Sequence, residues 1–170
     1  MKVLIIKTSS LGDLIHTLPA LTDAMAAIPG VRFDWVAEES FCEIPGWHPA
    51  VERVIPVTIR RWRRDWIGAW RSGEMGEFRR NPRLQEDDLV LGGQGLYKSA
   101  LLARMAHGVT AGLDAGSARE PGAARLYRKR VRVEREMHAI ERVRSLFAQA
   151  LGYGLPDSDP DYGIRLDADP

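Results

Sequence analysis

The sequence lacks several features that would assign a protein to a class at once. Cys42 is the only cysteine among 170 residues, which excludes an intrachain disulfide and fits a reducing compartment. No apolar run approaches the roughly 20 residues that a membrane-spanning helix needs. The first residues, Met1–Lys7, do not resemble a secretory signal. We therefore expect a cytoplasmic protein.

An excess of charge of one sign is also lacking. The 24 lysines and arginines nearly balance the 23 acidic residues, so a general polycationic nucleic-acid binder is disfavoured. The four histidines show no metal-ligand spacing with Cys42 or with one another, and we assign no metal and no nucleophile. Neither Gly-x-Gly-x-x-Gly nor Gly-Lys-Ser/Thr occurs, which disfavours an ordinary dinucleotide-dependent enzyme. No cofactor is expected.

Apolar runs alternate with helical patterns along the chain. The expected strands are Val3–Ile6, Val31–Ala37, Val51–Val57, Asp88–Leu91 and Val109–Leu113. The expected helices are Leu11–Ile28, Leu96–His107 and Arg135–Leu151. This alternation predicts an α/β fold with a Rossmann-like, doubly wound, mainly parallel sheet. The tail from Asp157 to Pro170 is rich in Asp and Pro and resembles an interdomain linker, so we expect a domain over 1–156 and the start of a linker over 157–170.

The first twenty residues are the most informative. The aliphatic run Val3–Ile6 suits a strand covered on both faces, and Thr8–Ser10 offer hydroxyls to the free N–H groups of a helix start. Gly12 leaves room for close approach of a ligand. Asp13 then lies near a helix N-terminus at the carboxyl end of a strand, where a general base would be expected. An ordinary first-turn Asp, worth about 0.3–1 kcal/mol to its helix, is the alternative that spacing alone favours.

A second candidate is the segment Ile59–Trp66, which follows the third expected strand. It holds four arginines in five positions, and guanidinium groups pair bidentately with phosphates and carboxylates. Trp62, Trp66 and Trp70 can sit at a lipid interface or stack on rings. The segment could grip an anionic substrate, bind nucleic acid through phosphates, or form a solvated loop.

A third candidate is the glycine-rich turn Gly92–Ser99. Its backbone N–H groups could face an anion, with Lys98 adding charge, or the glycines could serve only a tight connection. Arg119–Pro121 and the basic run Arg125–Arg135 are further candidates for an anion-facing edge. For the basic run, a solvated surface is the default interpretation.

Collinear stretches over most of the chain carry a family resemblance. The stretch Lys7–Asp23 resembles the N-terminal signature of the lipopolysaccharide heptosyltransferase I family, within glycosyltransferase family 9. The other matching stretches are Phe33–Glu39, Ile44–His48, Ala50–Val57, Ile59–Arg64, Gln94–Ser99, Ala118–Pro121, His138–Arg144 and Ala150–Tyr153.

The resemblance implies the N-terminal domain of a GT-B glycosyltransferase, an inverting enzyme of two facing Rossmann-like domains. Such an enzyme moves heptose from ADP-heptose to the Kdo residue of Kdo-lipid A, without a metal, at the cytoplasmic face of the inner membrane. The N-terminal half receives the acceptor and the C-terminal half holds most of the nucleotide sugar. By this resemblance the chain is the acceptor-binding half, lacks the donor-binding domain and is inactive alone. The alternative is a truncated, non-catalytic anionic-glycolipid binding module.

The resemblance also implies residue roles. It makes Asp13 the catalytic base that deprotonates the acceptor hydroxyl. The substrate-binding residues that it implies are Thr8, Ser9, Ser10, Gly12, Arg60, Arg61, Arg63, Lys98 and Arg119. Two departures stand out. Gly92 replaces an Asp that the family usually carries, from which we expect a more flexible turn. The stretch Trp66–Asp87 predicts a less regular helix, broken or kinked at Pro82.

Overall fold

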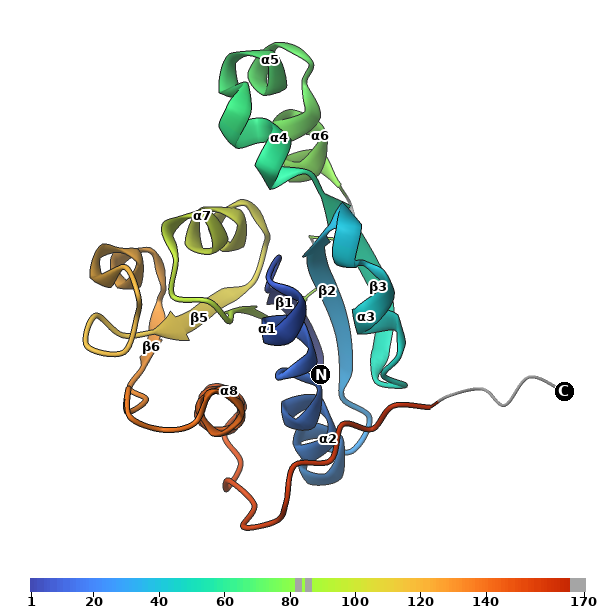
Figure 1. Ribbon diagram of the computed structural model, residues 1–170, viewed down its shortest axis with the longest axis vertical. Helices are drawn as coiled ribbons and strands as arrows, with labels where there is room; N and C mark the ends of the chain where they lie inside the picture. Colours follow the sequence, from blue (N-terminus) through green and yellow to red (C-terminus); the bar gives the residue numbers. More distant parts are fainter. Residues whose placement is uncertain (82–83, 85–86, 166–170) are drawn as a thin grey trace, which may run out of the picture.

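The protein is built on a six-stranded sheet in which every pairing of neighbouring strands is parallel (Figure 1). The computed structural model describes residues 1–81, 84 and 87–165. The strands are β1 (Lys2–Ile6), β2 (Arg32–Glu38), β3 (Val51–Val57), β4 (Leu89–Gly92), β5 (Val109–Leu113) and β6 (Lys129–Val131). Their order across the sheet is β3-β2-β1-β4-β5-β6, which is the Rossmann order. The predicted fold class is confirmed.

Helices connect the strands and cover both faces of the sheet. The α-helices are α1 (Leu11–Ile15), α2 (Leu18–Ala27), α3 (Glu43–Gly46), α4 (Ile59–Arg64), α5 (Trp66–Arg71), α6 (Glu74–Arg80), α7 (Tyr97–Met105) and α8 (Ala139–Leu151). The described residues also form the 3-10 helices η1 (Glu39–Phe41) and η3 (Pro121–Leu126). In Figure 1, α4, α5 and α6 group together beyond the end of β3, apart from α2 and α8.

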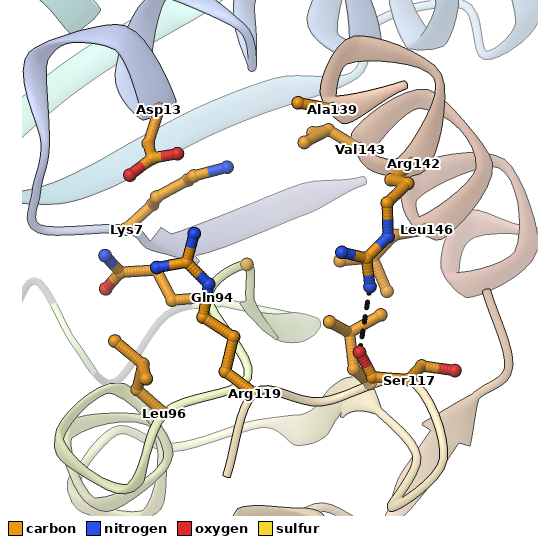
Figure 2. A pocket seen from close by; sticks show the side chains of 12 residues that line it. Lys7, Asp13, Gln94, Leu96, Ser117, Arg119, Ala139, Arg142, Val143 and Leu146 are labelled. Carbon is orange, nitrogen blue, oxygen red and sulfur yellow. Dashed lines mark hydrogen bonds between the residues drawn. The ribbon is translucent and has the colours of Figure 1, made fainter. Parts of the chain in front are cut away.

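The strand order reverses between β1 and β4. These neighbouring strands send their connections to opposite sides, and the crevice that this leaves at their carboxyl ends is where open α/β sheets bind ligands. Residues that follow both strands, among them Asp13 and Gln94, line a pocket there (Figure 2). The topology therefore joins two of the three segments singled out in the sequence.

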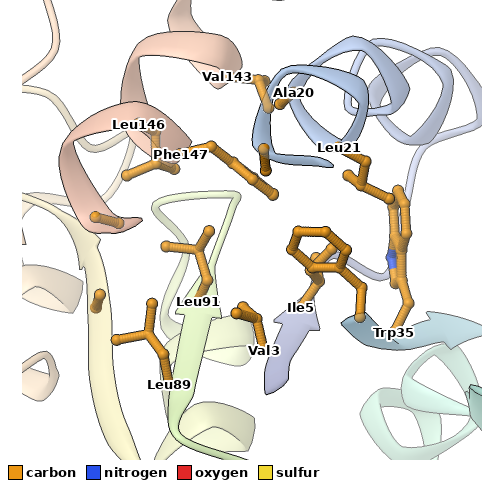
Figure 3. Close-up of a cluster of buried hydrophobic side chains, with 14 of the residues drawn as sticks. Val3, Ile5, Ala20, Leu21, Trp35, Leu89, Leu91, Val143, Leu146 and Phe147 are labelled. Carbon is orange, nitrogen blue, oxygen red and sulfur yellow. The ribbon is translucent and has the colours of Figure 1, made fainter. Parts of the chain in front are cut away.

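Alternate residues of β1 face two separate apolar layers. Val3 and Ile5 pack toward α2 and α8 in a layer that includes Leu21 and Phe147 (Figure 3). Leu4 and Ile6 belong to the layer on the other face, which α7 helps to cover. All four β1 side chains are fully buried, and each contributes about 1.5–3 kcal/mol through the apolar surface it removes from water. The unbroken aliphatic run thus reflects burial on both faces.

The strands expected from sequence are present, but the first helix is not continuous. The bounds of β3 and β5 agree with the prediction, and the other three strands differ by one residue at one or both ends. The predicted single helix Leu11–Ile28 is wrong, because α1 ends at Ile15 and α2 begins at Leu18. Pro19 explains the break, since it has no N–H to donate and its ring clashes with the carbonyl four residues earlier. It is instead accommodated in the first turn of α2.

The last predicted helix, Arg135–Leu151, begins later than expected. α8 begins at Ala139 rather than Arg135, with His138 as its N-cap. Its predicted end is confirmed, because Gly152 has φ of 83°, a left-handed conformation that suits glycine after a helix.

Two regions are more structured than the sequence indicated. The basic run contains β6, whose Val131 is buried while Lys129 and Arg130 are exposed. The expected irregular helix over Trp66–Asp87 is two short helices, α5 and α6, separated at Gly73, which has φ of 80°. Pro82, the expected kink, lies outside the described residues.

The described part of the tail runs across the domain without a helix or strand. Arg144 of α8 donates to the carbonyl oxygens of Pro156 and Ser158. Further along, Gly163 passes so close to His48 that a Cβ there would lie 2.6 Å from His48 Nε2. Residues 166–170 are outside the described part, and the division at 156 and 157 stays a prediction. No described helix is long and apolar enough to cross a membrane.

Candidate functional site

Asp13 closes the first turn of α1 through its own side chain. The backbone N–H and the hydroxyl of Ser10 each donate to Asp13 Oδ2, over 3.0 Å. This reciprocal capping box anchors one carboxylate oxygen. The other, Oδ1, makes no hydrogen bond to any residue that the structure describes. The structural role that spacing alone favoured therefore exists, and it leaves one oxygen available in the pocket.

The surroundings of Asp13 keep it ionised. Partial burial alone would raise the pKa of this carboxyl group, but the Ser10 hydrogen bonds and the charges of Lys7 and Arg119 lower it below its usual value. An aspartate of this kind can accept a proton at neutral pH, as a general base must.

Lys7 is a site residue that the sequence did not single out. Its side chain is 4% exposed and extends under Asp13 toward the pocket (Figure 2). Burial lowers the pKa of its ammonium group to about 8; Asp13 opposes this shift, while Arg119 and Arg142 add to it. The sequence did contain a signal for Lys7, because it is a lysine directly after a fully buried strand. The residue that follows a parallel strand lies at the crevice beyond the strand's carboxyl end.

Gln94 joins the two loops of the crevice. Its side-chain Nε2 donates to the Ser9 carbonyl, and its Oε1 accepts from the backbone and the hydroxyl of Thr8, both over 3.3 Å. Ser99 of α7 also donates to Oε1. In the sequence, Gln94 belongs to the glycine-rich turn and to a stretch that resembles the family, and neither indicates that it holds the Thr8–Ser10 loop against α7.

Two arginines bound the lower and right sides of the pocket in Figure 2. Arg119 follows β5 and approaches Lys7 and Asp13, as expected for an anion-facing residue. Arg142 of α8 was not predicted to be a site residue; its Nη2 donates to the Ser117 carbonyl over 2.8 Å. Its buried Nε has no hydrogen-bond partner within the described part of the chain. The amphipathic pattern of α8 does not indicate that Arg142 lines the pocket.

The three predicted arginines of α4 do not act together. Arg60 and Arg63, three residues apart on one face, lie near Lys98; burial and these two charges lower the pKa of the Lys98 ammonium group. Lys98 also donates to Ser9 Oγ over 3.2 Å. Arg61 lies on another face, where its Nη2 contacts Glu74 at 2.7 Å. Arg60, Arg63 and Lys98 therefore form a group of cations beside the Ser9 loop, next to the residues that line the pocket, while Arg61 has a carboxylate partner elsewhere.

The tryptophans of the arginine segment also differ from one another. Trp62 packs against the apolar layer of α7, and its indole N–H donates to Glu74 over 2.8 Å. Trp70 is 74% exposed. The side chain of Trp66 is outside the described part. Gly12 is exposed beside Asp13, with open space where a Cβ would lie.

Comparison with known proteins identifies the family. Residues 75–169 match the profile of "Glycosyltransferase family 9 (heptosyltransferase)". The chain belongs to glycosyltransferase family 9. It is 57% identical over 175 residues to lipopolysaccharide heptosyltransferase 1 of Pseudomonas aeruginosa, a match that covers 100% of this chain and 49% of that protein. The chain therefore spans about half the length of the curated relatives it matches, and the predicted resemblance to heptosyltransferase I is confirmed.

Solved family 9 structures share the fold. The E. coli heptosyltransferase WaaC with ADP-2-deoxy-2-fluoro heptose is 54% identical, with a TM-score of 0.91 over 96% of this chain and 52% of that one. The same protein with ADP gives a TM-score of 0.89 over the same shares. E. coli ADP-heptose lps heptosyltransferase II, at 20% identity and a TM-score of 0.69, shares the fold over 99% of this chain and 47% of that one. The GT-B assignment of this Rossmann-like sheet is confirmed.

Gly92 is the position where this family 9 chain departs from the resemblance. The expectation of a flexible turn is wrong, because Gly92 is a buried residue of β4. The ring of Tyr127 lies over Gly92 and Gly112, and a Cβ on Gly92 would be 2.0 Å from its hydroxyl. A glycine is required three residues later, at Gly95, where φ is 62° and a Cβ would approach the Ala118 backbone to 3.0 Å.

Proposed function

We propose that this chain is the acceptor-binding and catalytic-base half of a lipopolysaccharide heptosyltransferase I. The reaction is inverting transfer of heptose from ADP-heptose to the Kdo residue of Kdo-lipid A. The observation that carries the proposal is the ionised Asp13, with one oxygen anchored and one available, inside a crevice edged by cations. The comparisons support a heptosyltransferase.

Asp13 is suited to the proton transfer that this reaction needs. As the acceptor hydroxyl oxygen attacks the anomeric carbon, a new C–O bond forms while the bond from that carbon to the ADP phosphate oxygen breaks in line. The hydroxyl becomes acidic as the new bond forms, and its proton passes to Asp13 Oδ1. ADP leaves with the electron pair of the broken bond. The Ser10 hydrogen bonds to Oδ2 hold the carboxylate in one orientation during the transfer.

The cations of the crevice suit an acceptor rich in carboxylate and phosphate. Arg60, Arg63 and Lys98 approach one side of the Ser9 loop, while Lys7 and Arg119 approach Asp13. Guanidinium groups bind such anions bidentately, and a buried ammonium binds more strongly when an anion replaces its lost hydration. Arg61 would contribute less, because Glu74 already neutralises it.

The donor is bound mainly by the partner half of a GT-B enzyme, so we propose that this chain alone transfers no heptose. A lipid-linked acceptor also requires the chain to work at a membrane surface, which we propose is the cytoplasmic face of the inner membrane. We propose that the transfer uses no metal and no organic cofactor, because arginine and lysine side chains can balance the charge that develops during the reaction.

Calorimetric titration with de-acylated Kdo-lipid A and, separately, ADP-heptose tests the binding role. We expect acceptor binding without measurable ADP-heptose binding. The double variant Arg60→Ala/Arg63→Ala should lose at least about tenfold in acceptor affinity, because two charge-assisted contacts are removed. Arg61→Ala is the matched control and should stay within about threefold. Equal losses in both variants would contradict the assignment of the two faces of α4.

The catalytic role needs a donor half. In a chimera that carries residues 1–165 in place of the matching half of the E. coli relative, Asp13→Asn keeps an oxygen for the Ser10 hydrogen bonds but cannot take a proton. We expect heptose transfer to fall by about 10²–10⁴-fold while acceptor affinity changes little. Transfer that survives Asp13→Asn would contradict the catalytic-base role. An unsubstituted chimera that binds the acceptor but transfers no heptose would favour the alternative, a non-catalytic anionic-glycolipid binding module.

A further inference from the structure

Helix α5 presents two apolar side chains to solvent. Ile67 is 48% exposed and Trp70 is 74% exposed, and their spacing of three residues puts them on one face of the helix. Ala69, between them in sequence, is 6% exposed and packs inward. Contiguous apolar surface exposed in this way is a mark of an interaction site.

The exposure of Ile67 and Trp70 does not result from poor packing among α4, α5 and α6. Asp65 Oδ1 accepts from the Gly68 backbone N–H over 2.7 Å at the start of α5. Trp62 and Phe78 pack edge to face across α4 and α6, with ring centroids 6.3 Å apart. The three short helices therefore hold themselves together without Trp70, and Figure 1 shows α5 at their outer end, away from the sheet.

Positive charge surrounds the exposed face. The segment Ile59–Arg80 holds seven arginines and three acidic residues, an excess of four positive charges in a protein whose net charge is +1. Arg64 and Arg71 are exposed, and neither side chain makes a hydrogen bond or ion pair with another described residue. Arg71 is four positions from Ile67, so it borders the same face. Apolar and tryptophan side chains edged by cations are the pattern of a surface that inserts shallowly into an anionic bilayer.

We propose that α5 docks this chain on an anionic lipid bilayer, with Ile67 and Trp70 entering the boundary between headgroups and acyl chains. Arg64 and Arg71 would contact lipid phosphates. The inference rests on the proposed function, because it names the surface by which an enzyme of a lipid-linked acceptor stays at the membrane.

Co-sedimentation of the full chain with lipid vesicles tests the proposal. Vesicles of phosphatidylcholine containing about 30% phosphatidylglycerol are compared with vesicles of phosphatidylcholine alone, neither holding any glycolipid. We expect binding to the anionic vesicles that weakens as salt is added. Trp70→Ser and Ile67→Ser should each lower the partition coefficient about tenfold, and Arg64→Ala/Arg71→Ala should also weaken the salt dependence.

The matched control is Leu101→Ser, because Leu101 is a similarly exposed apolar side chain, at 55%, on a different helix, α7. It should bind vesicles as the unsubstituted chain does. Circular dichroism checks that each variant folds. The proposal is overturned if the chain ignores anionic vesicles, if it binds the two vesicle types equally, or if Leu101→Ser loses as much as Trp70→Ser. Self-association that Trp70→Ser abolishes would overturn it in favour of a second copy of the chain.

The same proteins separate this inference from the proposed function. Trp70→Ser should titrate de-acylated Kdo-lipid A with unchanged affinity. Vesicle binding without acceptor binding would contradict the proposed function and leave the docking surface standing. Acceptor binding without vesicle binding would contradict the docking surface alone.

Discussion

The hydroxyl of Tyr127 occupies the space that a side chain at Gly92 would need. A Cβ on Gly92 would lie 2.0 Å from that oxygen and 2.5 Å from the ring carbon that bears it. Both residues are buried, so neither can move aside into solvent. The glycine that departs from the resemblance is therefore matched by a tyrosine that fills its place.

Gly92→Ala should destabilise the protein by about 1–3 kcal/mol or more, because the methyl group overpacks the site. In the double variant Gly92→Ala/Tyr127→Ala the clash is gone, so its cost should be less than the sum of the two single costs. Gly46→Ala is the control, since a Cβ there meets nothing within 4 Å. Urea unfolding measures all four variants, and additive costs would show that the two residues are not coupled.

Lys7 should make the protein more stable as pH rises above 8. Between its folded pKa of about 8 and its ordinary value of 10.5, only the unfolded chain holds the proton, so the folded state gains with rising pH. The gain is about 2 kcal/mol between pH 8 and 10. Above pH 10 it is opposed by Tyr127 and Tyr153, whose pKa values burial raises.

Urea unfolding at several pH values compares the parent with Lys7→Met. The variant should show a smaller rise, because only Lys98, whose pKa is also lowered, still contributes, whereas Lys129→Met, at an exposed lysine, should keep the full rise. An undiminished rise in Lys7→Met would contradict the assignment to Lys7.

His48 should make the protein less stable in mild acid. Burial lowers the pKa of this imidazole to about 4 from its ordinary 6.5, and the charge of Asp161 opposes that shift. Between these values only the unfolded chain binds the proton, so stability is lost as pH falls from 6.5. We expect a loss of about 2 kcal/mol by roughly pH 5, before most carboxylates titrate.

The comparison is between His48→Gln and His107→Gln, because His107 is exposed. The melting temperature of the His48 variant should change less between neutral pH and mild acid than that of the parent or the His107 variant. Identical acid profiles for all three proteins would contradict the assignment to His48.

Arg144 and Asp23 form the buried ion pair that also holds the tail. Arg144 Nε lies 2.7 Å from Asp23 Oδ2, and the two side chains are 1% and 7% exposed. Arg144→Met leaves a buried carboxylate without its partner and should cost about 3–5 kcal/mol. Arg144→Met/Asp23→Leu should cost less than the single variant, because no unpaired charge remains.

The same substitution should free the tail for proteolysis, since Arg144 donates to the carbonyl oxygens of Pro156 and Ser158. Limited proteolysis read by mass spectrometry should find faster cleavage near residue 157 in Arg144→Met. A fully stable Arg144→Met, or unchanged cleavage, would argue against this anchoring role.

Much of the fold could be predicted from sequence because burial on both faces leaves a direct mark. The run Val3–Ile6 is apolar throughout, and helical patterns alternate with the expected strands, which few architectures other than a doubly wound sheet accommodate. β6 and the short helices left no such mark, because three to seven residues give too little periodicity to read. Pro19 ended α1 early for a local reason that the sequence did contain.

The candidate site divides in the same way. The chain order alone placed Asp13 after a strand and at a helix start, and the clustered arginines and glycines were visible as motifs. Only the tertiary structure decided that Gln94 fastens the Ser9 loop, that Lys7 lies buried under Asp13, and that Arg61 is paired with Glu74. The reason is that hydrogen bonds and charge interactions act between atoms a few ångströms apart, and the reversal of strand order between β1 and β4 determines which distant residues reach that distance.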